Sequence, residues 1–154
     1  MLVFTVLHIL SMFTMVTLFV GGAFYYAYAV WRRDVRALAS FHRIERESRV
    51  GIVGLVALLA GLVFGILAAL TGEIDVLDGW LIAAYVLVAA FVANVAVSVK
   101  TLEELGDKAV EADAGRRPVE EVVADMASSP ATRYFVVNVA LFAAIIVDMV
   151  LKPF

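Results

Sequence analysis

Three side chains that can bind a soft metal ion lie on one face of the first apolar segment. His8, Met12 and Met15 are spaced i, i+4 and i+7, which places them on one side of an α-helix. Imidazole and thioether groups are ligands that suit Cu(I). Met149, in the last apolar segment, is expected at a similar depth and adds another thioether. These residue types predict a metal site, and copper is the metal that the donors favour.

The same donors have two other interpretations. Methionine commonly fills gaps between apolar helices, and a histidine in a membrane segment can simply hydrogen-bond to a neighbouring helix. Haem binding is a less favoured alternative, because the other histidine, His42, is expected across the bilayer from His8. A haem would therefore need His8 from two subunits, or Met149 as its second ligand.

Three further polar residues are predicted within the membrane. An ionisable group in a membrane segment is a functional candidate by default, because leaving it in lipid costs several kcal/mol. Asp148, near the end of the last segment, is expected at a depth where it can pair with His8. Asn94 and Asn138 also have matching depths, and a hydrogen bond between their amides would satisfy both.

Four apolar, almost uncharged segments must position these groups. The chain has 154 residues, of which 64% are hydrophobic and 18% charged. About 20 helical residues cover a hydrocarbon core of about 30 Å. The sequence predicts an all-α membrane protein that forms one domain over residues 1–154, an antiparallel bundle of four transmembrane helices. The predicted spans are residues 2–31, 50–71, 80–99 and 134–151.

Two connections carry helical patterns of their own. The first helix is longer than a bilayer needs, so it either tilts or continues, and residues 35–42 repeat apolar side chains at helical spacing. Residues 101–112 are predicted to prolong the third helix. After Pro118, a short cytoplasmic amphipathic helix is expected on the membrane or on the inner end of the bundle. Its apolar stripe comprises Val119, Val122, Val123 and Met126.

The basic residues predict an orientation. Of the 12 Lys and Arg residues, six lie in residues 32–49 and five in residues 100–133. Because basic connections stay in the cytoplasm, both termini and the acidic turn 72–79 are expected outside. Anionic lipid headgroups are the expected partners of Arg32, Arg33, Arg36, Arg43, Arg46 and Arg49. His42, within this charged connection, is predicted to be a solvated surface residue.

Small residues predict where helices pack closely. Ala57, Gly61, Gly65 and Ala69 recur every four residues in the second span. In lipid, such a ridge lets two helix backbones approach each other. It packs either within the bundle or at the seam of a homodimer.

The sequence gives little support for enzyme chemistry. The chain has no cysteine, phosphate-binding loop, nucleophile elbow or zinc-protease motif, and its connections carry no nucleic-acid signature. The leading function is transport or metal handling by a homo-oligomer in the lipid bilayer. The alternatives are a structural or accessory subunit beside a partner membrane subunit, and a haem-binding redox protein.

Four short motifs resemble a bacterial family of predicted four-helix membrane proteins of unknown function. They are Leu7-His8-Ile9-Leu10-Ser11, Gly21-Gly22, His42-Arg43-Ile44-Glu45-Arg46 and Met149-Val150-Leu151-Lys152-Pro153. That family is distantly similar to the copper-resistance D type of membrane protein. The resemblance implies a four-helix fold and a location in the bacterial inner membrane.

Overall fold

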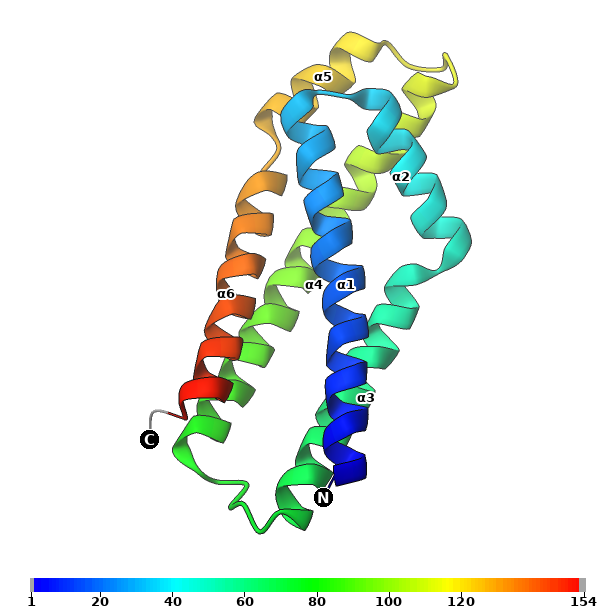
Figure 1. The fold of residues 1–154 in the computed structure, drawn as a ribbon. Helices are drawn as coiled ribbons and strands as arrows, with labels where there is room; N and C mark the ends of the chain where they lie inside the picture. The colour runs from blue at the N-terminus through cyan, green and yellow to red at the C-terminus, as the bar shows by residue number, and fades with distance from the viewer. Residues whose placement is uncertain (1, 153–154) are drawn as a thin grey trace.

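The structure is a computed structural model that describes residues 2–152 as six α-helices, with no strand in that range. In chain order they are α1 (Leu2–Arg32), α2 (Val35–Ser48), α3 (Val50–Thr71), α4 (Gly79–Asp113), α5 (Val119–Ser128) and α6 (Ala131–Leu151) (Figure 1). The helices α1, α3, α4 and α6 are long and apolar enough to cross a membrane. The all-helical class and the four apolar spans are therefore confirmed.

The chain has two halves with the same order of elements. Each half contains a long, a short and a medium helix, with 31, 14 and 22 residues in the first and 35, 10 and 21 in the second. Both long helices start at one end of the molecule, and both medium helices return to it (Figure 1). We call this the turn end, because it carries residues 72–78. The cap, at the opposite end, comprises α2, α5 and the parts of α1 and α4 that contact them.

A two-residue break separates α1 from α2. Arg33 has φ 55°, a left-handed conformation that ends α1. The Asp34 carboxylate then accepts a hydrogen bond from the Ala37 N–H at 2.9 Å, which caps the new helix. The first helix therefore does not continue through residues 35–42. The chain turns instead, so that the apolar face of α2 reaches the cap.

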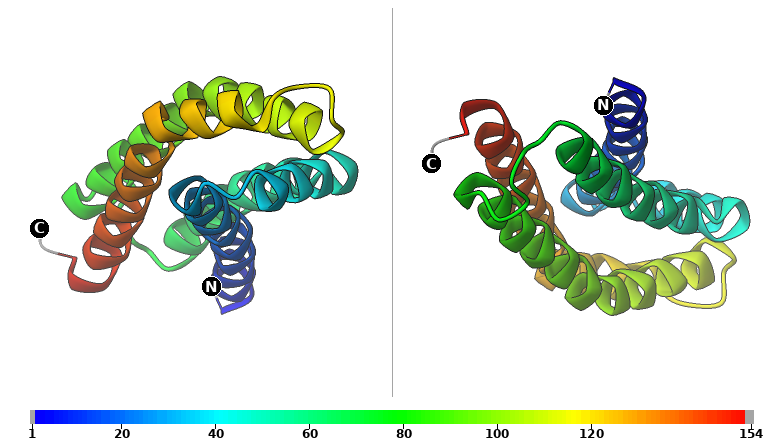
Figure 2. Two further views of the ribbon diagram at one scale, coloured as in Figure 1. Left: turned by 90° about the horizontal axis from the view of Figure 1, so that it is seen from above. Right: turned by 90° about the horizontal axis from the view of Figure 1, so that it is seen from below.

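The cap has a core like that of a water-soluble domain. Buried apolar residues from α1, α2, α4 and α5 meet there, including Ala29, Leu38, Ala109 and Val122, none of which is exposed. Residues 101–112 belong to α4, as predicted, and provide one wall. Seen from above, α5 follows the end of α4 along one edge, and α2 runs beside them (Figure 2). The residues predicted to form a short helix after Pro118 thus pack on the end of the bundle.

The apolar part of the molecule is more open. There α1 packs on α3, α4 packs on α6, and α1 also contacts α6. The buried side chains of Met15, Leu58 and Phe91 join α1, α3 and α4. Within the described range, the backbones of α3 and α4 make no close contact. An apolar groove of about 530 Å³ lies between them.

Candidate functional site

Most of the residues predicted to bind metal lie in the contact between α1 and α3, which we call the seam. The His8 Nδ1 atom lies 2.7 Å from the Gly61 carbonyl oxygen, a hydrogen bond between the two helices. A Cβ placed on Gly65 would stand 2.9 Å from His8 Nδ1, and one on Gly61 would stand 2.5 Å from Met12 Sδ. The two glycines of the predicted small-residue ridge therefore receive the side chains of α1 directly.

The four predicted metal ligands do not form one cluster. Met15 is buried beside Leu58, and Met12 packs against that group. Met149 packs instead in a separate cluster at the turn end, with Trp80. No group of three or more His, Asp or Glu side chains with metal-binding geometry is present in residues 2–152. Along this seam, the structure uses His8, Met12 and Met15 for packing.

The two intramembrane asparagines meet. Asn94 Nδ2 donates to Asn138 Oδ1 at 2.9 Å and also lies 3.3 Å from the Tyr134 carbonyl oxygen. These contacts join α4 to α6 near the cap. The ridge alanines lie elsewhere, with Ala57 against the Met15–Leu58 group and Ala69 in the turn-end cluster.

Asp148 is the unusual polar residue of the apolar part. Its side chain lies in α6, the residue is only 7% exposed, and Oδ2 has no hydrogen-bond partner. His8 bonds to Gly61 through Nδ1, and the expected pair between His8 and Asp148 is not formed in the structure. A buried carboxylate without a partner is costly when ionised, which marks this position as a candidate site.

Two features beside Asp148 are not apparent from the sequence patterns. One helical turn later, the Lys152 N–H donates to the Asp148 carbonyl oxygen at 2.9 Å. The Lys152 ammonium then lies 4.9 Å from the centre of the Trp80 ring, a cation–π contact between α6 and α4. The i, i+4 spacing of Asp148 and Lys152 is the sequence signal that links the two residues.

The cap contains a second histidine, and the prediction that His42 is a solvated surface residue is wrong. His42 is only 4% exposed, and a Cβ on Gly106 would overlap its ring at Nδ1. The imidazole Nε2 lies 3.0 Å from Asp107 Oδ1, to which Arg46 donates at 2.7 Å. The fold back at Arg33 brings α2 against α4, and this contact removes His42 from solvent.

Carboxylates of α4 also change the role of the predicted lipid-binding arginines. Asp107 pairs with Arg46, and Asp113 pairs with Arg36 and Arg43, at N–O distances of 2.7, 3.8 and 2.6 Å. The remaining members of the set, Arg32, Arg33 and Arg49, are exposed and form no ion pair within the part of the chain that the structure describes.

Burial also affects a carboxyl group on α2. Desolvation raises the pKa of Glu45, the nearby His42 lowers it to a smaller extent, and Glu103 adds a further increase. The cap therefore holds at least one acid that is easier to protonate than in water.

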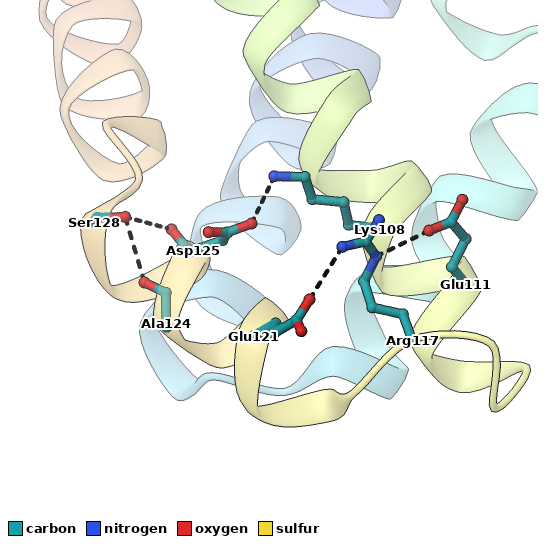
Figure 3. Close-up of polar contacts among 7 residues, drawn as sticks. All are labelled: Lys108, Glu111, Arg117, Glu121, Ala124, Asp125 and Ser128. Carbon is teal, nitrogen blue, oxygen red and sulfur yellow. Dashed lines mark hydrogen bonds and ion pairs between the residues drawn. The ribbon is translucent and has the colours of Figure 1, made fainter.

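Polar contacts join α4, α5 and the loop between them (Figure 3). Lys108 Nζ lies 2.6 Å from Asp125 Oδ2, and Arg117 contacts both Glu111 and Glu121. The Ser128 hydroxyl donates to carbonyl oxygens of the preceding turn. These contacts hold α5 against α4, and both basic residues drawn in Figure 3, Lys108 and Arg117, are paired.

The apolar helices and the few membrane-depth polar contacts define an integral membrane protein. The chain belongs to the family described as predicted integral membrane protein DUF2269, whose model matches residues 2–153. No curated protein and no solved structure matches the chain. The match confirms the predicted membership of a membrane family of unknown function. The similarity to copper-resistance D proteins stays a prediction. In the last of the four motifs that resemble the family of unknown function, Pro153 lies outside the described residues.

Proposed function

We propose that this protein is a non-enzymatic membrane protein that binds a cation in the outer half of its helical bundle, for transport or metal handling. The observation that carries the proposal is the buried, unpaired carboxylate oxygen of Asp148. A cation at this oxygen would offset the desolvation of the carboxylate, which no other group in residues 2–152 does by hydrogen bonding.

Copper is one version of this proposal. It is supported by the donor types of His8, Met12 and Met15, and by a His8 ring nitrogen that is not engaged by Gly61. The separation of Met149 from this set argues for a site centred on His8 rather than on all four residues. Haem binding, the weaker version, would require a second chain.

The proposal includes an orientation. The four apolar helices form an antiparallel bundle in a bacterial inner membrane, with the cap in the cytoplasm and both termini outside. The concentration of Lys and Arg in residues 32–49 and 100–133 supports it. Among the arginines, Arg32, Arg33 and Arg49 have the strongest case for contact with lipid headgroups, because they flank the apolar helices α1 and α3 and form no ion pair within residues 2–152.

Thermal unfolding of the purified protein tests cation binding. The protein in detergent is titrated with sodium, calcium or copper salts at constant ionic strength, beside the variants Asp148→Asn and Asp75→Asn. We expect one cation to raise the Tm of the wild type and of Asp75→Asn, but not that of Asp148→Asn. Equal responses of all three proteins would contradict the proposal.

Metal analysis separates the copper and haem versions. Copper bound by the seam should fall in His8→Ala and Met12→Ala. It should persist in the control variant Thr14→Ala, because the Thr14 side chain lies on the same helix but is exposed. Equal copper in all of them would exclude a seam site. A Soret band in the purified protein would favour haem.

A second candidate function is an accessory subunit of a larger membrane complex. The groove between α3 and α4 favours it, because Ala89, Ala93 and Ala96 on one wall would let another helix approach closely. Replacing Ala93 with Phe would then disrupt a native complex without unfolding the isolated chain. Recovery of the chain only as a stable homo-oligomer would favour self-association over a partner subunit.

A further inference from the structure

We propose that the turn end binds an organic ammonium ion between the Asp148 carboxylate and the Trp80 ring, and that Lys152 occupies the ring face when the ligand is absent. This inference rests on the proposed cation-binding function and names the class of cation. It uses two groups, Trp80 and Lys152, that the sequence patterns do not assign to any site.

The Trp80 ring provides the first half of the site. The Lys152 Nζ atom stands 4.9 Å from its centre, within the range of a cation–π contact. Tryptophan is the aromatic side chain that attracts cations most strongly, and aromatic faces recognise substituted ammonium ions. The chain therefore already places a cation of the proposed kind on this ring.

Asp148 provides the second half. It lies four residues before Lys152, whose N–H donates to the Asp148 carbonyl oxygen at 2.9 Å, so the two residues are neighbours where α6 ends. The Lys152 ammonium is on the ring, however, and Asp148 Oδ2 has no hydrogen-bond partner. An ammonium ligand that displaced Lys152 would gain the ring face and would also neutralise the buried carboxylate.

The surroundings favour an organic cation over a metal ion. The cluster around Trp80 contains Ala69, Leu81 and Met149, which present apolar surface. Hard metal ions such as calcium take six to eight oxygen ligands, whereas Asp148 is a single buried carboxylate and no metal-binding group of three is present in residues 2–152. Apolar walls, one carboxylate and one aromatic face suit an alkylated ammonium ion.

Thermal unfolding with tetramethylammonium chloride tests the inference on the full chain in detergent. Sodium chloride at the same ionic strength controls for screening. A saturating ligand, at about 100 times its Kd, should raise the Tm by roughly 5–10 °C. Asp148→Asn should lose this response, and the exposed-turn variant Glu73→Gln should keep it.

Lys152→Gln supplies the decisive variant, because it removes the competing ammonium. It should bind tetramethylammonium roughly 2- to 5-fold more tightly than the wild type, the range expected for loss of one exposed cation–π contact. Unchanged or weaker binding in Lys152→Gln would overturn the inference. So would an undiminished response in Asp148→Asn, whose fold is checked by circular dichroism.

The outcomes also separate this inference from the proposed function. If sodium, calcium or copper gives a shift that depends on Asp148 while tetramethylammonium gives none, cation binding stands and the ammonium site fails. If no cation gives such a shift, both fail.

Discussion

The apolar part and the cap each contain one histidine whose ring packs against a glycine of a neighbouring helix. The two histidines differ in the group to which they hydrogen-bond. In the apolar part, His8 lies on Gly65 and bonds to the Gly61 carbonyl oxygen at 2.7 Å. In the cap, His42 lies on Gly106 and bonds to the Asp107 carboxylate at 3.0 Å. Both rings pack on a glycine, but the hydrogen-bond acceptor is a neutral backbone carbonyl in the apolar part and a carboxylate in the cap.

The difference reflects the solvent around each region. A carboxylate beside the His8 ring would have to lose its hydration in lipid, so a backbone carbonyl is the acceptor that carries no such penalty. The carboxylates of the cap are partly exposed to solvent, and Asp107 and Asp113 each contact two basic side chains. Burial of apolar surface should also stabilise the cap far more than the apolar part, because lipid is as apolar as a leucine side chain.

Truncation of the cap core should have the largest effect. Leu38 is not exposed at all, and Leu38→Ala should lower the free energy of unfolding by about 2–5 kcal/mol, through lost burial and a cavity. Denaturant titration of the purified protein measures it. Ile44→Ala, on the exposed face of α2, is the control and should change stability by less than about 0.5 kcal/mol.

The matched truncation in the apolar part should have a smaller effect. Leu58 is 3% exposed, so it is packed about as tightly as Leu38. Since the unfolded helices remain in lipid, only packing is lost, and Leu58→Ala should be about 1–2 kcal/mol less destabilising than Leu38→Ala. Equal effects in the same titration would contradict the comparison of the two regions.

Replacing the glycine under each histidine ring with alanine tests the two histidine contacts. Gly106→Ala should destabilise the protein by about 1–3 kcal/mol, because the new methyl group overlaps a ring held by Asp107. Gly51→Ala is the control, since its Cβ meets nothing within 4 Å, and it should stabilise α3 by about 0.5–1 kcal/mol. Gly65→Ala should lie between them, because a carbonyl bond holds His8 less firmly.

A smaller coupling is expected between the intramembrane asparagines. A double-mutant cycle with Asn94→Ala and Asn138→Ala should give about 0.6 kcal/mol, the average for hydrogen bonds between membrane helices. The cycle is measured by unfolding in mixed micelles. A coupling of zero would show that the two amides act independently.

The smallest effect concerns the pH dependence of the cap. Burial raises the pKa of Glu45 above its ordinary value of 4.5, so its contribution to stability is complete below that value and is lost as pH rises through the folded-state pKa. Glu45→Gln should therefore raise the Tm slightly at pH 7, and the difference should disappear near pH 4. Glu47→Gln, which makes the same charge change on the exposed side of α2, is the control variant in these measurements.

The sequence predicts the position of a residue along its helix well and the rotation of that helix poorly. The rise per residue fixes how far Asn94 and Asn138 lie from the ends of their spans, so their depths match, and the two residues do meet. The same argument matches His8 with Met149, but they face different neighbours. Rotation depends on which helices are adjacent, and the hydropathy pattern does not carry that information.

In the cap, the sequence failed to predict the burial of His42. The charges around His42 are typical of a solvated connection. The burial of His42 depends on the break at Arg33 and on Gly106, which has no side chain where the ring packs. A break between α1 and α2 and one glycine more than 60 positions later in the chain must act together. The apolar spacing of residues 35–42 is the available local signal, and it does identify the face of α2 that is buried.

The two-halved order of the helices has a consequence for synthesis in the cell. Helices α1 and α3, both in the first half, pack against each other, and the His8–Gly61 hydrogen bond joins them. A nascent chain that has emerged only as far as residue 71 thus holds a complete pair of helices, ready to associate in the bilayer while the ribosome is still translating α4. The second half, arriving later, meets a partner that is already formed.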